Sequence, residues 1–178
     1  MNTYLEFEKP IEQLDNKVHE LKSLNDNAPS DNLLEEITQV EEQINETYRK
    51  IYSSISPWQR TLVARHPQRP KTREYIQNLI EDFFPLSGDR FFSEDKAILG
   101  GFGKFRGKTV LVLGHEKGHD TTSRIEHNFG MPRPEGYRKA QRLMKLAEDF
   151  DIPVISFVDT PGAYPGVGAE QRGQSEAI

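Results

Sequence analysis

Cysteine is absent from this sequence of 178 residues. Without thiols the chain forms no disulfide, no thiolate metal site and no cysteine nucleophile. A chain that lacks disulfides is consistent with a reducing compartment, so we expect a cytoplasmic protein. A chain of this length buries about 70% of the surface of its unfolded form, which is enough for a real core.

Long apolar runs and an excess of positive charge are also missing. No stretch approaches the roughly 18 apolar residues of a membrane span, and the N-terminus has neither the basic nor the apolar region of a signal peptide. The formal net charge is -5, whereas nucleic-acid binders are normally basic. We therefore expect no membrane and no nucleic-acid partner.

The first 55 residues are polar, with apolar residues spaced by three and four, which is typical of amphipathic helices. The segment "NDNAPSDN" interrupts this spacing, so residues 1–55 are predicted to form a helical hairpin arm. A helical connector over residues 56–95 is predicted next. One helix begins at Pro57, with Ser56 and Gln59 forming a capping box, and another is expected over "REYIQNLIEDFF", residues 73–84, with Thr72 as its cap.

Residues 96–178 have the pattern of an α/β domain. "KAILGGFGKFRGKTVLVLG" predicts two strands joined by a tight turn. The apolar runs "TVLVL" and "IPVISFV" predict buried strands, and a helix over "PEGYRKAQRLMKLAEDF" lies between them. Strand, helix and strand in this order predict a parallel crossover. The apolar stripe expected on that helix comprises Ala140, Leu143, Met144, Ala147 and Phe150.

Residues 115–119 read His115-Glu116-Lys117-Gly118-His119, which is the H-E-x-x-H spelling of zinc peptidases. That chemistry needs both histidines on one face of a helix. Here the five residues follow a strand directly and include a glycine, which is costly inside a helix. We therefore expect a loop at the end of a strand, and keep a zinc metallopeptidase as an alternative function. Such a loop suits an anionic ligand, for which Lys117 is a candidate contact.

A second loop, "DTPGAYPGVGAEQRG" at residues 159–173, follows the second apolar strand. Its prolines fix φ while its glycines let the backbone approach a ligand closely. Helix-forming residues begin near Glu170, and backbone N–H groups gathered before a helix favour negative charge. No G-K-[ST] or G-x-S-x-G motif is present, so the residues predict an enzyme that binds an anion or an enolate, without a serine nucleophile.

Four segments together resemble one family: "ARHPQRP", "GDRFFSEDKAILGG", "NFGMPRPEGYRKA" and "DTPGAYPGVGAEQRGQSEAI". They are similar, in the same order, to the alpha subunit of the bacterial acetyl-CoA carboxylase carboxyltransferase, and the similarity covers essentially the whole chain. It implies a crotonase-like fold of stacked β-β-α units. Residues 96–178 would be its first, truncated part.

The resemblance also implies the reaction. The family transfers a carboxyl group from carboxybiotin to acetyl-CoA and gives malonyl-CoA for fatty-acid synthesis. It implies a beta subunit in an α2β2 assembly, a biotin carboxyl carrier protein and a biotin carboxylase that consumes ATP. Carboxybiotin is presented by the carrier, no cofactor is bound covalently, and zinc is expected only in the beta subunit.

The site residues that the resemblance implies lie in the loop at 159–173. The wall of the carboxybiotin pocket is assigned to Gly162, Ala163, Tyr164, Pro165 and Gly166. Lys117 and Arg138 are candidate contacts for anionic parts of the ligands. The catalytic oxyanion donors are expected partly beyond residue 178, in a later glycine-pair segment, so a chain ending at Ile178 is expected to be inactive. A non-catalytic assembly fragment is thus a further alternative.

Overall fold

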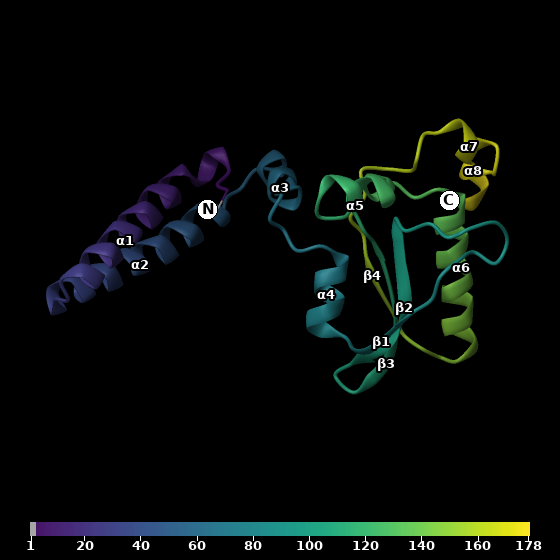
Figure 1. Ribbon diagram of the computed structural model, residues 1–178, viewed down its shortest axis with the longest axis horizontal. Helices are drawn as coiled ribbons and strands as arrows, with labels where there is room; N and C mark the ends of the chain where they lie inside the picture. Colours follow the sequence, from purple (N-terminus) through teal and green to yellow (C-terminus); the bar gives the residue numbers. More distant parts are fainter. Residues whose placement is uncertain (1–2) are drawn as a thin grey trace. The chain divides into compact units, whose positions relative to one another are not determined.

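The computed structural model describes residues 3–178, in two compact units, Met1–Arg69 and Pro70–Ile178 (Figure 1). The elements of the first unit are η1 (Glu6–Glu8), α1 (Lys9–Asn27), α2 (Asp31–Tyr52) and α3 (Pro57–Ala64). Those of the second are α4 (Thr72–Leu79), β1 (Glu81–Pro85), β2 (Ile98–Phe105), β3 (Lys108–His115), α5 (Thr121–Glu126), η2 (Asn128–Gly130), α6 (Pro134–Asp149), β4 (Val154–Phe157), α7 (Val167–Glu170) and α8 (Gln174–Ala177). Within the described residues, no helix combines the length and apolar character needed to cross a bilayer.

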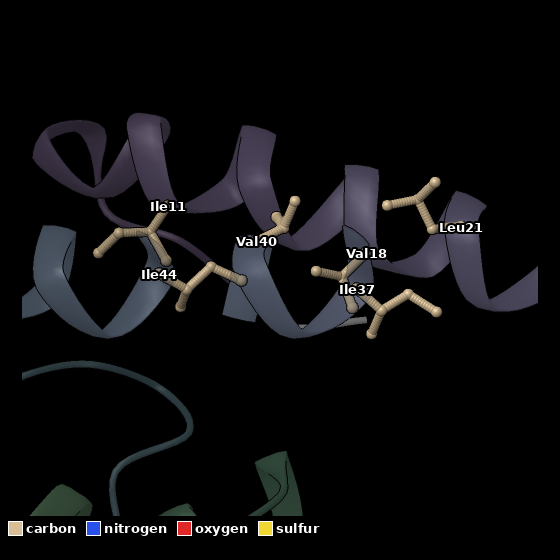
Figure 2. Packing of buried hydrophobic residues seen from close by; sticks show 6 residues of the cluster. All are labelled: Ile11, Val18, Leu21, Ile37, Val40 and Ile44. Carbon is tan, nitrogen blue, oxygen red and sulfur yellow. The ribbon is translucent and has the colours of Figure 1, made fainter. Parts of the chain in front are cut away.

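In the first unit, α1 and α2 pack along their apolar faces (Figure 2). The buried residues recur at helical spacing because only one face of each helix meets the other. They are Ile11, Val18, Leu21, Ile37, Val40 and Ile44. Ion pairs between the helices, such as Lys17 with Glu36 at 2.8 Å, are half exposed and contribute little to stability. The apolar stripe therefore holds this unit together.

The end of the first unit has the local structure that the sequence indicates. The Ser56 hydroxyl accepts from the Gln59 N–H at 3.2 Å, and the Gln59 side chain accepts from the Ser56 N–H at 2.7 Å, which confirms the capping box. His66 and Gln68, in the "ARHPQRP" segment, hold the main chain of Thr3. His66 Nδ1 accepts from the Gln68 N–H, so Nε2 carries the proton and donates to the Thr3 carbonyl at 2.7 Å.

The second unit is built on a sheet with the order β1-β2-β3-β4. Strands β2 and β3 form the predicted antiparallel hairpin. Its turn places Arg106 at φ 50° and Gly107 at φ 75°, the left-handed pair of a tight hairpin turn. Strands β3 and β4 are parallel and are joined through α6, so the predicted crossover is confirmed.

Helices cover both faces of this sheet (Figure 1). Val110 and Val112 of β3 pack against α4, whereas Leu111 and Leu113 pack against α6. Because alternate side chains of a strand point to opposite faces, a strand covered on both faces needs apolar residues throughout. This explains the continuous run "TVLVL".

The prediction of a helix through Phe84 was wrong, because residues 81–85 form strand β1. Asp82 has a left-handed φ of 51°, and the segment pairs with β2 across a bulge. Two glycines of β2 make this pairing possible. A Cβ at Gly101 would lie 2.3 Å from the Phe84 carbonyl oxygen, and one at Gly103 would lie 2.3 Å from Ile80. Long-range pairing therefore overrides the local helical spacing.

Two predictions of burial also need correction. Strand β4 lies at the edge of the sheet, and Val154 is 44% exposed, so "IPVISFV" is not a fully buried strand. On α6, Leu143 and Ala147 are completely buried, but Met144 is 43% exposed and Phe150 is 68% exposed. The apolar stripe is narrower than the sequence suggests because α6 contacts the sheet along one line of residues.

Replacing Leu143 by Ala should destabilise the second unit by about 2–5 kcal/mol, because it opens a cavity between α6 and the sheet. The neighbouring change Met144→Ala should cost less than about 1 kcal/mol, since that side chain is largely in solvent. Urea denaturation followed by circular dichroism measures both. Equal losses of stability would show that the sheet face of α6 is wrongly assigned.

Candidate functional site

Two loops leave the same edge of the sheet, where the parallel strands β3 and β4 end. The first, residues 116–120, leads from β3 to α5, and the second leads from β4 into residues 159–173. The carboxyl ends of neighbouring parallel strands are where α/β proteins usually bind ligands. We call residues 159–173 the glycine loop.

The H-E-x-x-H segment does not have the geometry of a zinc peptidase. His115 is the last residue of β3, Gly118 has a left-handed φ of 74°, and helix α5 begins only at Thr121. The histidines therefore do not share a helix face. Within residues 3–178, no three His, Cys, Asp or Glu side chains come together in a way that could hold a metal ion.

Glu116, the would-be base of that motif, has a structural role. Its side chain is buried and accepts the backbone N–H groups of Arg73, Lys117 and Gly118, each at 3.0 Å. A carboxylate with its oxygens occupied in this way organises a loop and does not activate water. It joins the start of α4 to the end of β3.

Lys117 lies at the edge of the sheet, as expected, but it is already paired. Its Nζ is 2.5 Å from Oδ1 of Asp159 at the start of the glycine loop. The Asp159 N–H donates to Nδ1 of His115 at 3.4 Å. Burial lowers the pKa of His115, although the Phe157 backbone and the charge of Asp159 oppose this effect. The structure thus brings His115, Lys117 and Asp159 together, and an incoming anion would compete with Asp159 for Lys117.

The predicted pocket residues, 162–166, differ in whether their backbone N–H groups already bind an acceptor within the protein. The Gly162 N–H donates to the Thr160 hydroxyl at 3.1 Å, and the Tyr164 N–H donates to the Pro132 carbonyl at 2.9 Å. Pro165 has no N–H. Within the described residues, the N–H groups of Ala163 and Gly166 have no acceptor. Among the predicted pocket residues, these two groups are therefore free to bind an anion.

Close packing explains why residue 166 is glycine. A Cβ at this position would lie 2.2 Å from the Tyr164 ring, too close for any side chain. The Arg133 guanidinium lies over the same ring, 4.7 Å from its centroid. Gly162 has a φ of 149°, which also disfavours other residues. The conformation of the loop therefore depends on the packing of the Tyr164 ring between Gly166 and Arg133.

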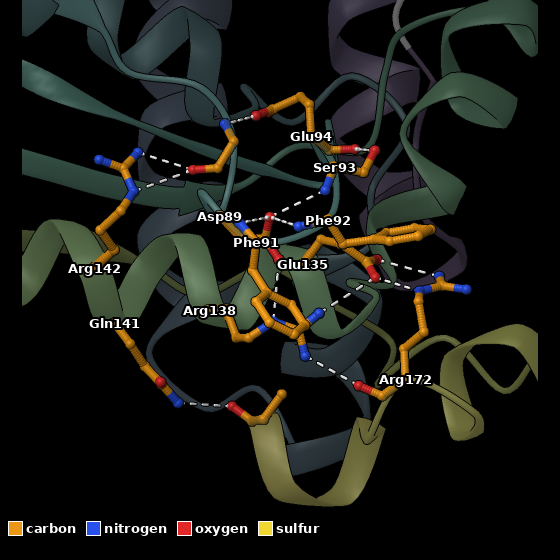
Figure 3. A network of polar contacts seen from close by, with 12 residues as sticks. Asp89, Phe91, Phe92, Ser93, Glu94, Glu135, Arg138, Gln141, Arg142 and Arg172 are labelled. Atoms are coloured by element: carbon orange, nitrogen blue, oxygen red, sulfur yellow. Dashed lines mark hydrogen bonds and ion pairs between the residues drawn. The ribbon is translucent and has the colours of Figure 1, made fainter.

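Arg138 is held within the protein, as Figure 3 shows. Its guanidinium contacts Asp89 at 3.1 Å, the Arg172 carbonyl at 3.0 Å and Glu135 at 3.5 Å, and it lies over the Phe91 ring. We call Asp89, Glu135, Arg138 and Arg172 the charge cluster. The sequence suggested that Arg138 contacts an anionic ligand. In the structure its guanidinium binds groups of the protein itself.

The sequence reasoning did not single out Asp89, although "GDRFFSED" contains its signal. An Asp followed by a short turn often accepts the next backbone N–H groups. Here Oδ1 accepts from Phe91, Phe92 and Ser93 at 2.8–3.0 Å. Burial alone would raise the pKa of Asp89, but these N–H groups and Arg138 outweigh it and lower the pKa to about 2.

The end of the glycine loop also differs in detail from the prediction. Helix α7 begins at Val167, not near Glu170, and it ends at Glu170. Gln174 follows in α8 and is buried. Its Nε2 donates to the carbonyls of Pro132, at 2.9 Å, and Tyr164, at 3.1 Å. Gln174 therefore holds the predicted pocket wall against the segment that precedes α6.

The matching family model and the most similar curated proteins indicate the same family. Residues 4–178 match the family model described as acetyl co-enzyme A carboxylase carboxyltransferase-like. The chain is 56% identical over 174 residues to the acetyl-coenzyme A carboxylase carboxyl transferase subunit alpha of Paramagnetospirillum magneticum, covering 98% of this chain and 55% of that protein. It is 57% identical over 178 residues to the protein of the same name from Rhodopseudomonas palustris, covering 100% and 55%. The chain thus spans about half the length of these relatives.

One solved structure is similar to this chain in its fold. A single-chain, multi-domain long-chain acyl-CoA carboxylase matches with a TM-score of 0.50 and 24% sequence identity, over 65% of this chain and 11% of that chain. This likeness concerns the fold alone. It agrees with the α/β class that the strand and helix pattern predicts.

The contribution of Asp89 to stability should depend on pH. Because its pKa is lower in the folded state than in the unfolded chain, it stabilises the fold above about pH 4 and loses this effect as the pH falls towards about 2. Asp89→Asn should therefore be less stable than wild type at neutral pH, and the difference should shrink between pH 4 and 2. Urea denaturation across this range measures it, with the exposed Glu148→Gln as control. A difference that does not change with pH would contradict the assignment.

Proposed function

Because the chain belongs to the acetyl co-enzyme A carboxylase carboxyltransferase-like family, we propose that it acts in the transfer of a carboxyl group from carboxybiotin to acetyl-CoA, which gives malonyl-CoA for fatty-acid synthesis. The similarity across residues 4–178 is the observation that carries this proposal. The zinc-peptidase alternative has no comparable support, since its motif is not on a helix and its glutamate is occupied.

The partners follow from the name of the relatives, which is that of a subunit alpha. We propose a beta subunit in an α2β2 assembly, with biotin carboxyl carrier protein and biotin carboxylase supplying carboxybiotin in the cytoplasm. Zinc would belong to the beta subunit. The second unit would be the first part of a crotonase-like fold. Because the chain spans 55% of its relatives, the activity is that of the whole protein and not of residues 1–178 alone.

The reaction creates negative charge in two places. When the C–N bond of carboxybiotin breaks, charge develops on the ureido oxygen of biotin. When the methyl group of acetyl-CoA loses its proton, an enolate forms, and its carbon makes the new C–C bond to the carboxyl carbon. The ureido nitrogen can accept the methyl proton, so no side-chain base is required.

The free N–H groups of Ala163 and Gly166 fit this chemistry. Fixed backbone donors stabilise developing charge without reorganising, and one such donor is typically worth roughly 2.7–4 kcal/mol. These donors lie in the wall proposed for the carboxybiotin pocket, residues 162–166. Lys117, at the same edge of the sheet, would contribute a positive charge that it now shares with Asp159.

The experiment replaces Gly166 by Ala in the protein assembled with a carboxyltransferase beta subunit. The added methyl group must displace Tyr164 or the loop, because no space exists for it. We expect malonyl-CoA formation to fall about tenfold or more, as donors lose their alignment. Formation of malonyl-CoA from carboxybiotin and acetyl-CoA is measured directly.

Met144→Ala serves as the control, since that side chain is exposed on α6 and is not part of the glycine loop. It should retain wild-type activity. Wild-type activity in Gly166→Ala would contradict the role of the loop. An assembled wild-type enzyme that forms no malonyl-CoA would contradict the proposed function itself.

A further inference from the structure

Glu135 is a buried carboxylate that two arginines share (Figure 3). Its side chain is 2% exposed. The second residue of α6, it forms an ion pair with Arg172 through Nε and Nη2, and it also contacts Arg138 at 3.5 Å. A carboxylate placed so deeply is stable only while its partners remain.

Arg172 joins this carboxylate to the far end of the glycine loop. It is the next-to-last residue of the loop, and its carbonyl accepts from Arg138 at 3.0 Å. Its guanidinium also lies over the Phe92 ring, 4.6 Å from the centroid. Arg172 therefore attaches the end of the loop to α6 twice, through its side chain to Glu135 and through its carbonyl to Arg138.

The charge cluster is balanced. Asp89 and Glu135 carry two negative charges, and Arg138 and Arg172 carry two positive charges. Removing one of the carboxylates leaves a positive charge without a partner in a poorly solvated place. Of the four, Arg172 is the most exposed, at 27%. Within its loop, residues 159–173, Ala169 is the one fully buried residue, whereas α6 and the sheet share a buried core. If the ion pair is lost, we therefore expect the loop to move and the helix to stay in place.

The beginning of the glycine loop lies against residues 130–132, which precede α6. Thr160 donates to the Gly130 carbonyl at 2.6 Å, and Tyr164 donates to Pro132 at 2.9 Å. Along the chain, Ala163 lies between these two contacts, and Gly166 lies between Tyr164 and Arg172. The direction in which they point thus depends on both attachments.

We infer that Glu135 is a positioning residue for carboxyl transfer. Through Arg172 it holds the glycine loop so that the N–H groups of Ala163 and Gly166 stay aligned for the charge that develops on biotin. This inference rests on the proposed function for its catalytic consequence. The structural part, that Glu135 orders the loop, stands without it.

Glu135→Gln tests the inference in the assembled enzyme. The amide keeps the shape of the carboxylate but removes its charge, so Arg172 loses its ion pair. We expect kcat for malonyl-CoA formation to fall about tenfold to a hundredfold, because misplacement of the donors acts on the transition state. The KM for acetyl-CoA should stay within about twofold, since no acetyl-CoA contact is removed.

The matched control is Glu126→Gln, which removes a carboxylate from the exposed ion pair with Lys96 at 3.0 Å. It should leave kcat and KM unchanged. Arg172→Lys keeps the positive charge and should retain more activity than Arg172→Gln. The same kcat in Glu135→Gln and Glu126→Gln would overturn the inference.

Hydrogen exchange of the backbone amides separates this inference from the proposed function and from misfolding. In Glu135→Gln, the hydrogen-bonded amides of the loop, those of Gly162, Tyr164 and Ala169, should exchange faster, while those of β2 and β3 stay protected as in wild type. Unchanged exchange in the loop would overturn the inference, and so would a uniform loss of protection. If wild type forms no malonyl-CoA, the proposed function fails, and this exchange measurement still decides the role of Glu135.

Discussion

The buried ion pair of Glu135 with Arg172 is the contact on which the candidate site depends. It lies where α6 begins, next to the turn that Asp89 organises and beneath the end of the glycine loop. Three segments that are distant in the sequence are thereby fixed to one helix end. Because a buried ion pair seldom adds much net stability, its value here lies in specifying one arrangement of the loops. A site built from backbone N–H groups needs such an arrangement, since it has no side chain to readjust.

Most of the elements could be predicted from the sequence because their signals are local. The capping box at Ser56, the turn at Gly107 and the apolar run of β3 each depend on residues that are neighbours in the chain. Strand β1 could not be predicted, because it exists only where Gly101 and Gly103 let it approach β2. The exposure of Met144 likewise depends on the angle at which α6 meets the sheet, which the sequence pattern does not contain.

In the candidate site, too, features with a local sequence signal could be predicted, and features that depend on long-range contacts could not. The position of the glycine loop after a parallel strand followed from the order of elements, and the family resemblance assigned residues 162–166 to a pocket. The particular N–H groups that remain free depend on which others bond to Thr160 and Pro132. The internal partners of Arg138 were also hidden, because a charged residue on an amphipathic helix usually faces solvent. Two of the segments that carry the family resemblance, "GDRFFSEDKAILGG" and "NFGMPRPEGYRKA", thus supply contacts that position the loop.

A crystal structure of the assembled wild-type enzyme with biotin bound would test the central claim most directly. We expect the ureido oxygen of biotin within hydrogen-bond distance of the Ala163 or Gly166 N–H, with Arg172 still paired to Glu135. A bound biotin that is remote from residues 162–166, or an Arg172 side chain that has left Glu135 for solvent, would contradict the account.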